Sequence, residues 1–220
     1  MKLIEHMREY LVGYALIAGS LVLTAIAAVQ FGHREPLQVS GLREGAFTDS
    51  LEATSIHLSE SGTAVVVISD YLCPSCSVLA RNLRSLDAKH PGRLSVSVHH
   101  FIVSGDSMSV TAAVAVECAA RVGVSSSVDL RLYSAVDRGP LTDSIVRELL
   151  VGSTPTSEQA EVASCFDTRA PKDRVESDSR RARELGLLGT PALVVRGRLY
   201  YGALSTDSLE SLLLAPEGKP

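Results

Sequence analysis

The sequence predicts an α/β domain in which an all-helical insert separates the two halves of a small mixed sheet, preceded by one transmembrane helix. Three observations lead to this prediction. Residues 11–31 are apolar and carry no charge, a run of β-branched residues leads directly toward Cys73 and Cys76, and strand patterns return near 192–201 after a long helical stretch.

Composition and charge narrow the class of protein. The chain has 220 residues, of which 45% are hydrophobic, enough to bury the core of one domain. Its formal net charge is −4, and the basic residues form no long cluster. A protein that binds nucleic acid needs a positive surface, so we expect no nucleic-acid partner.

The N-terminal segment has the properties of a membrane anchor. Residues 11–31 form an uncharged helix candidate whose length, at ~1.5 Å per residue, matches a hydrocarbon core of ~30 Å. Lys2 and Arg8 precede it, which favours residues 1–10 as a cytoplasmic tail and places the rest of the chain outside the cytoplasm. Ala25-Ile26-Ala27 resembles a signal-peptide cleavage site, so a cleaved leader stays open as an alternative.

The rest of the chain divides into a tether and a domain. Residues 32–45 are polar and contain Pro36 and Gly41, which predicts a linker that tethers the domain. Residues 46–220 then form the extracytoplasmic domain. Its cysteines are therefore expected to face an oxidising compartment.

The most informative motif is a pair of cysteines at a predicted strand-to-helix junction. Residues 65–68 are typical of a strand buried on both faces, and the leucine spacing over 79–86 is typical of an amphipathic helix. Cys73 is therefore expected to start a helix, where free backbone N–H groups and the helix dipole stabilise a thiolate. Cys76 lies one helical turn further on and can form a disulfide with it, which indicates redox chemistry.

A metal site is the main alternative for this pair. Zinc would need two further ligands at short spacing, but Cys118 and Cys165 lie far apart in the sequence. His99 and His100 are neighbours on a predicted strand, so their side chains point to opposite faces. We therefore predict no metal and no other cofactor.

The remaining patterns give the order of elements. Strands are expected near 53–58 and 94–103, and a last strand pair at 192–195 and 198–201 precedes a helix that starts near 205. Glycines and prolines separate five predicted helices, at 107–122, 128–137, 142–151, 157–166 and 172–185. The helical insert thus occupies about residues 104–188.

This order of elements and three motifs resemble the DsbA-like thioredoxin-fold family. The motifs are residues 69–76, 112–119 and 185–192, the last followed by Gly202, and the resemblance covers about residues 48–215. It implies a thioredoxin fold that carries an inserted helical subdomain. It also implies that the protein is a thiol–disulfide oxidoreductase.

The resemblance assigns roles to the dithiol. Cys73 is the expected nucleophile, and Cys76 resolves the mixed disulfide that Cys73 forms. Pro74 and Ser75 lie between them and are expected to tune the thiolate. A Ser hydroxyl carries no charge, so we expect a milder oxidant than the DsbA proteins that have His at this place.

Two further residue pairs follow from the resemblance. Pro191 is expected to follow a cis peptide bond and to pack on the dithiol, with the Thr190 backbone exposed to an extended substrate strand. Cys118 and Cys165 are expected to form a structural disulfide, with two buried free thiols or an electron-relay pair as the alternatives. Asp70 is interpreted as a strand-end residue rather than as a proton acceptor.

The predicted function is that of a membrane-tethered oxidant. We expect a monomer that exchanges disulfides with exported cysteine-containing proteins and is reoxidised by a redox partner in the membrane. One alternative is a disulfide reductase or isomerase of the envelope, although an isomerase usually needs a dimerisation module that residues 32–45 do not resemble. The other is an envelope protein that binds copper or zinc through the two cysteines.

Overall fold

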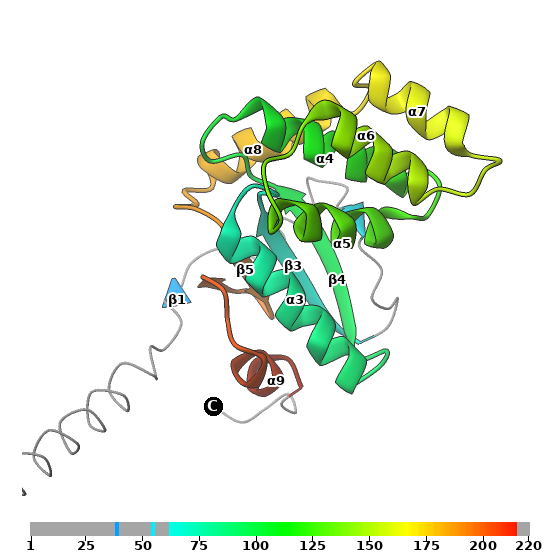
Figure 1. The fold of residues 1–220 in the computed structure, drawn as a ribbon. Coiled ribbons are helices and arrows are strands. Elements are labelled where there is room, and N and C mark those ends of the chain that lie inside the picture. Colours follow the sequence, from blue (N-terminus) through cyan, green and yellow to red (C-terminus); the bar gives the residue numbers. More distant parts are fainter. Residues whose placement is uncertain (1–37, 40–53, 56–61, 215–220) are drawn as a thin grey trace, which may run out of the picture. The chain divides into compact units, whose positions relative to one another are not determined.

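A mixed sheet forms the centre of the domain (Figure 1). The structure is a computed structural model that describes residues 38–39, 54–55 and 62–214. Within these residues the strand order is β1-β6-β5-β3-β4-β2, with β3 and β4 parallel and the other neighbours antiparallel. The strands are β1 (Gln38–Val39), β2 (Thr54–Ser55), β3 (Thr63–Ser69), β4 (Leu94–His100), β5 (Ala192–Val195) and β6 (Arg198–Tyr201).

Helices cover both faces of this sheet and extend beyond one end of it. They are α3 (Pro74–Lys89), α4 (Ser107–Ala120), α5 (Ser125–Val136), α6 (Asp143–Gly152), α7 (Gln159–Asp167), α8 (Lys172–Glu184) and α9 (Thr206–Leu214). The sequence predicts α4 to α8 as the five helices of the insert, each within a few residues of its observed ends. Figure 1 shows α4 to α7 gathered beyond one end of the sheet.

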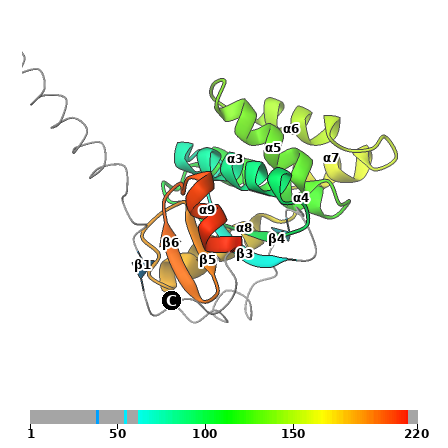
Figure 2. The same ribbon diagram turned by 90° about the horizontal axis from the view of Figure 1, so that it is seen from below.

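The central strand β3 connects two parts of the hydrophobic core. Successive residues of a strand point to opposite faces, so Val65 and Val67 belong to one core cluster and Val66 and Ile68 to another. The first cluster also contains buried leucines of α3 and α9, which lie side by side (Figure 2). The second contains Ala182 of α8. Burial on both faces is what the β-branched run predicts.

The insert has a hydrophobic cluster of its own, centred on α4. Residues 112–116 of this helix are fully buried, and α5, α6, α7 and α8 all pack against α4. Alternating Ala and Val side chains are small, which lets the surrounding helices approach closely. Asp106 caps the start of this helix, and its side chain accepts a hydrogen bond from the backbone N–H of Met108.

The predicted tail, residues 1–10, and the predicted membrane anchor, residues 11–31, lie outside the described residues. No helix within the described residues is long and apolar enough to cross a membrane. Part of the predicted linker, residues 32–45, is described, and there Gln38 and Val39 pair with β6. The prediction of a continuous linker misses this strand, because two residues are too few to produce a strand pattern.

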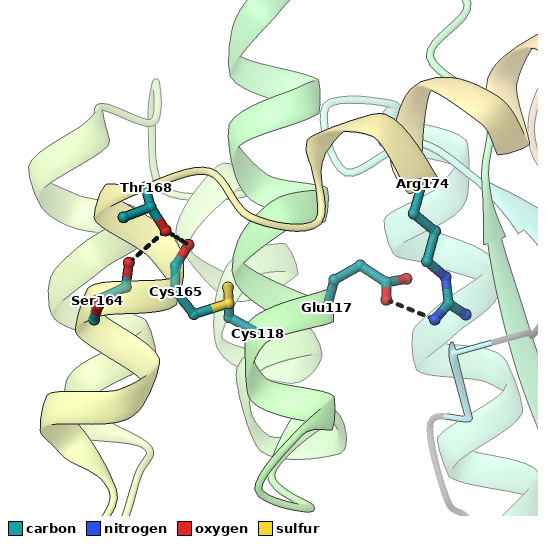
Figure 3. Close-up of a disulfide and its surroundings, with 6 residues drawn as sticks. All are labelled: Glu117, Cys118, Ser164, Cys165, Thr168 and Arg174. Carbon is teal, nitrogen blue, oxygen red and sulfur yellow. Dashed lines mark hydrogen bonds and ion pairs between the residues drawn. A yellow bond between two sulfur atoms is a disulfide. The ribbon is translucent and has the colours of Figure 1, made fainter.

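Cys118 and Cys165 form a disulfide, which confirms the predicted pairing (Figure 3). The sulfurs are 2.02 Å apart, and the bond joins α4 to α7. The neighbouring Glu117 lies 3.4 Å from the Arg174 guanidinium of α8 and hydrogen-bonds His100 of β4 at 3.0 Å. One turn of α4 is therefore connected to α7, to α8 and to the sheet.

We expect removal of this disulfide to destabilise the domain. Its cysteines are separated by 47 positions, and closing a loop of this size lowers the entropy of the unfolded chain by an amount worth ~4 kcal/mol. The double variant Cys118→Ala, Cys165→Ala should lose free energy of unfolding of this order in urea denaturation. Unfolding of variant and parent at the same urea concentration would contradict a structural role.

Candidate active site

The turn between β3 and α3 places Cys73 at the start of a helix. The Asp70 carbonyl accepts a hydrogen bond from the Cys73 backbone N–H at 3.1 Å. The Asp70 side chain accepts hydrogen bonds from Leu72 N at 3.0 Å and Ser109 Oγ at 2.7 Å, which fits its interpretation as a strand-end residue. Cys73 is the N-cap residue of α3 with an extended backbone, and Pro74 occupies the first turn, where a helix needs no backbone donor.

The Cys73 thiol is partly exposed, and its pKa is lowered from 9.0 to about 5. The main cause is a hydrogen bond from the Cys76 thiol, followed by hydrogen bonds from Thr190 and from the backbone N–H groups of Cys76 and Ser75. Partial burial acts in the opposite direction. Ser75 therefore stabilises the thiolate through its backbone, where the sequence suggested its hydroxyl.

Cys76 differs from Cys73 in both access and acidity. Its residue is 1% exposed, and burial, with the hydrogen bond to Cys73 as the second cause, raises the pKa of its thiol. Hydrogen bonds from the Asp70 backbone and the Ser69 side chain act against this shift. At neutral pH Cys73 is thus an accessible thiolate, while Cys76 is a shielded thiol.

The second half of the site comes from the loop before β5. The Cys73 sulfur lies 3.6 Å from the Thr190 carbonyl oxygen, although the two residues are 117 positions apart in the sequence. The Thr190–Pro191 peptide bond is cis, as the family resemblance implies, and the Pro191 carbonyl accepts a hydrogen bond from Gly202 N at 2.9 Å. Leu188 in the same loop is 79% exposed. The fold thus brings the dithiol and the Thr190–Pro191 loop together.

A buried polar group behind Cys76 carries no motif in the sequence. Asp129 and Tyr133 come from α5, one turn apart, and are 3% and 5% exposed. The Tyr133 hydroxyl lies 2.6 Å from Ser69 Oγ, and Asp129 Oδ1 accepts a hydrogen bond from the Tyr71 hydroxyl at 2.9 Å. The sequence signal that could have identified Asp129 is a carboxylate directly after Val128, which is buried, on the apolar face of the helix predicted at 128–137.

The two adjacent histidines lie next to different carboxylates. His99 lies 3.5 Å from Asp178 of α8, and His100 lies 3.0 Å from Glu117 of α4. Within the part of the chain that the structure describes, no three His, Cys, Asp or Glu side chains are grouped as metal ligands would be.

Comparison with known proteins identifies the family. The thioredoxin family model matches residues 53–215, which is most of the chain. The chain belongs to the thioredoxin family. This membership confirms the predicted thioredoxin fold, and the dithiol at the start of α3 agrees with the predicted class, a protein thiol–disulfide oxidoreductase.

Solved structures share the fold across most of the chain. ScsC from Proteus mirabilis, in a transitional conformation, is 21% identical, with a TM-score of 0.62 over 97% of this chain and 97% of that chain. BdbD from Bacillus subtilis, in its oxidised form, is 19% identical, with a TM-score of 0.61 over 80% of this chain and 96% of that chain. The thiol–disulfide exchange protein alpha-DsbA2 from Wolbachia pipientis is 17% identical, with a TM-score of 0.56 over 69% of this chain and 80% of that chain. No curated protein matches the sequence.

We expect the ultraviolet absorbance of the thiolate in the reduced protein to titrate near pH 5, and Cys73→Ala to abolish this transition. Cys76→Ala removes the strongest hydrogen bond to the sulfur and should shift the midpoint upward, toward 9.0. Because the folded-state pKa is depressed, the linked stability of the reduced form is fully present above the unfolded pKa and is lost as the pH falls through about 5. A midpoint near 9 in the parent would refute this assignment.

Proposed function

We propose that this protein is a membrane-tethered oxidant that exchanges its Cys73–Cys76 disulfide with the cysteines of exported proteins. A substrate thiolate attacks the Cys73 sulfur, and Cys76 leaves. A second substrate thiolate then attacks the substrate sulfur of the mixed disulfide, and Cys73 leaves as a thiolate. The substrate loses two electrons and gains a disulfide, and the two electrons reduce the Cys73–Cys76 pair.

The observation that carries the proposal is the low pKa of Cys73. A thiolate with a pKa of about 5 is a good leaving group, and its stability favours the reduced form of the protein, which makes the disulfide oxidising. The corresponding cysteine has a pKa of ~7 in thioredoxin, a reductant, and ~3.5 in DsbA, a strong oxidant. A value between them supports an oxidant of intermediate strength, in line with the uncharged Ser75, over a reductase.

Substrate binding is assigned to the Thr190–Pro191 loop. The Thr190 carbonyl lies within 3.6 Å of the reacting sulfur, so a polypeptide aligned along this loop would bring its own cysteine next to Cys73. Main-chain pairing gives affinity with little dependence on sequence, which suits an enzyme that acts on many exported proteins. The exposed Leu188 offers an apolar contact beside it.

Two features support the proposed location. Residues 11–31 are uncharged and long enough to anchor the protein in a membrane, with the domain on the extracytoplasmic side. The Cys118–Cys165 disulfide supports an oxidising compartment. We further propose that the domain acts as a monomer and that a membrane partner, which passes electrons to quinone, reoxidises the dithiol after each turnover.

A copper- or zinc-binding role is less well supported. A Cu(I) site would be expected to add methionine or histidine ligands to the two thiolates. The sequence has Met1, Met7 and Met108, all distant in sequence from the CxxC motif. Within the described residues, no three His, Cys, Asp or Glu side chains are grouped so that they could hold a metal ion.

Trapping of substrates tests the roles of the two cysteines. In the native membrane, Cys76→Ala should accumulate mixed disulfides through Cys73, because the resolving thiol is gone. Cys73→Ala is the matched control and should trap none, since Cys76 is 1% exposed. Mass spectrometry of the trapped adducts should identify exported proteins with cysteine pairs. Equal trapping by the two variants would refute the assignment.

The reduction potential tests the direction of electron flow. Equilibration of the Cys73–Cys76 pair with glutathione should give a value between those of DsbA, about −120 mV, and thioredoxin, about −270 mV. The Cys118→Ala, Cys165→Ala variant should give the same value, because that disulfide lies outside the site. A potential at or below that of thioredoxin would favour the reductase.

A further inference from the structure

The loop between α8 and β5, residues 185–191, is anchored at both ends. Near its start Leu187 is buried, and its backbone N–H donates a hydrogen bond to a carbonyl of α8 at 3.0 Å. At its end Pro191 is buried, and its carbonyl accepts a hydrogen bond from Gly202 N at 2.9 Å. Residues 188–190, the part of the loop beside the dithiol, lie between these two anchors.

The Tyr201 hydroxyl holds this middle part. It accepts a hydrogen bond from the Leu188 backbone N–H at 3.1 Å, across 13 positions of the sequence. Within the part of the chain that the structure describes, the backbone N–H groups of Gly189 and Thr190 have no protein partner. Gly189 also has no side chain to restrain its backbone. The position of Leu188 and Gly189 therefore depends on the Tyr201 hydroxyl.

Tyr201 is itself held in place by the sheet and the core. It is the last residue of β6 and lies opposite Ala192 of β5 in the antiparallel register. Its side chain packs against the core cluster that contains Leu187 and Leu199. A Tyr side chain has few torsions, so a packed ring gives its hydroxyl a defined position. The hydroxyl is thus a fixed acceptor for the loop.

This hydrogen bond limits how a substrate can pair with the loop. An extended polypeptide pairs through backbone N–H and C=O groups. The Leu188 N–H is already used, so the N–H groups open to a substrate are those of Gly189 and Thr190. The Thr190 carbonyl lies 3.6 Å from the Cys73 sulfur, which places this short pairing next to the reacting atom. So short a pairing gives little affinity, and side-chain contacts must add to it.

The Leu188 side chain is placed to supply such a contact. It is 79% exposed, so almost all of its apolar surface is available. Two residues separate it from Thr190 along the chain, a distance of at most about 7 Å. An extended substrate presents every second side chain on one face. The side chain two positions from the substrate cysteine would therefore meet Leu188.

We propose that Tyr201 is a positioning residue, whose hydroxyl fixes Leu188 as an apolar subsite for the side chain two positions from the substrate cysteine. The inference rests on the proposed exchange of the Cys73–Cys76 disulfide with exported proteins. It narrows their class to unfolded segments in which a cysteine and an apolar residue alternate. This pattern is typical of strands whose cysteine face becomes buried, and such segments are accessible only before the exported protein folds.

The other large apolar side chains exposed within the described residues lie on other elements. They are Val78 of α3, Val103 after β4, Leu130 of α5 and Ile145 of α6, each at most 49% exposed. Leu188 is the most exposed of the set and the one that belongs to the loop at the dithiol.

Single-turnover oxidation of reduced peptides tests the subsite. The oxidised protein is mixed with an excess of a two-cysteine peptide whose fluorophore is quenched when its disulfide forms. The dependence on peptide concentration gives a limiting rate and a half-saturating concentration. One peptide has Leu two positions before and after its first cysteine, and the other has Ser at both places. We expect the parent to be half-saturated by the Leu peptide at about fivefold lower concentration, with equal limiting rates.

Tyr201→Phe removes the hydroxyl and keeps the ring. It should raise the half-saturating concentration of the Leu peptide about fivefold, as the loss of one hydrogen bond does, and leave the limiting rate unchanged. The preference for Leu over Ser should fall below twofold in this variant and in Leu188→Ser. Dithiothreitol is too small to reach the subsite, so its rate of oxidation should stay that of the parent. The Cys73 thiolate should still titrate near pH 5 in both variants.

Tyr200→Phe is the matched control. Tyr200 precedes Tyr201 in β6, and its side chain points to the opposite face of the sheet, into the core cluster that contains Val65 and Leu193. This variant loses the same atom away from the loop. Its half-saturating concentrations and its preference should equal those of the parent.

The outcomes separate the subsite from the redox role. Parent kinetics in Tyr201→Phe would overturn the proposal, and so would the same loss in Tyr200→Phe or an equal slowing of dithiothreitol oxidation in Tyr201→Phe. A parent that oxidises dithiothreitol but does not distinguish the two peptides would overturn the subsite and leave the redox role intact. A parent that oxidises neither dithiothreitol nor the peptides would refute the proposed function, and the subsite with it.

Discussion

The turn that joins β3 directly to α3 is the constraint on which the site depends. β3 is buried on both faces at the centre of the sheet, so the position of its end is fixed by packing on both sides. Only three residues separate it from Cys73, and the helix therefore begins where the strand ends. The free N–H groups of the first turn then meet the Cys73 sulfur, and the same turn directs Cys76 into the core. Acidity of one thiol and shielding of the other are two results of a single backbone geometry.

The helical insert supplies polar groups beside Cys76, which the β3–α3 turn does not provide. A thiol that is driven into the core loses contact with water, and the core strand beside it, residues 65–68, has no ionisable side chain. α5 supplies the polar groups Asp129 and Tyr133 at this point, and α4, fixed by the Cys118–Cys165 disulfide, packs against α5. The disulfide of the insert therefore supports the packing of α4 on α5 and lies outside the redox site.

The parts of the molecule that the sequence predicted are those with local signals. The strand before Cys73, the helix after it and the five insert helices each produce a periodic pattern or a cap within a few residues. The Thr190–Pro191 loop and the Cys118–Cys165 pairing followed from the family resemblance, since no local pattern identifies partners so far apart. β1 was missed because two residues carry no period. The cavity behind Cys76 was missed because Cys76 and Asp129 come to the same lining only through the packing of α5 on α3, which no local pattern predicts.

The buried ion pair of Arg84 and Asp129 also has a cost in folding free energy. Removing two charges from water costs several kcal/mol per ion, and an apolar pair of similar volume would often be as stable or more so. Arg84 keeps 22% of its side chain exposed, so it retains part of its hydration, whereas Asp129 is almost fully desolvated. The cost therefore falls mainly on the carboxylate.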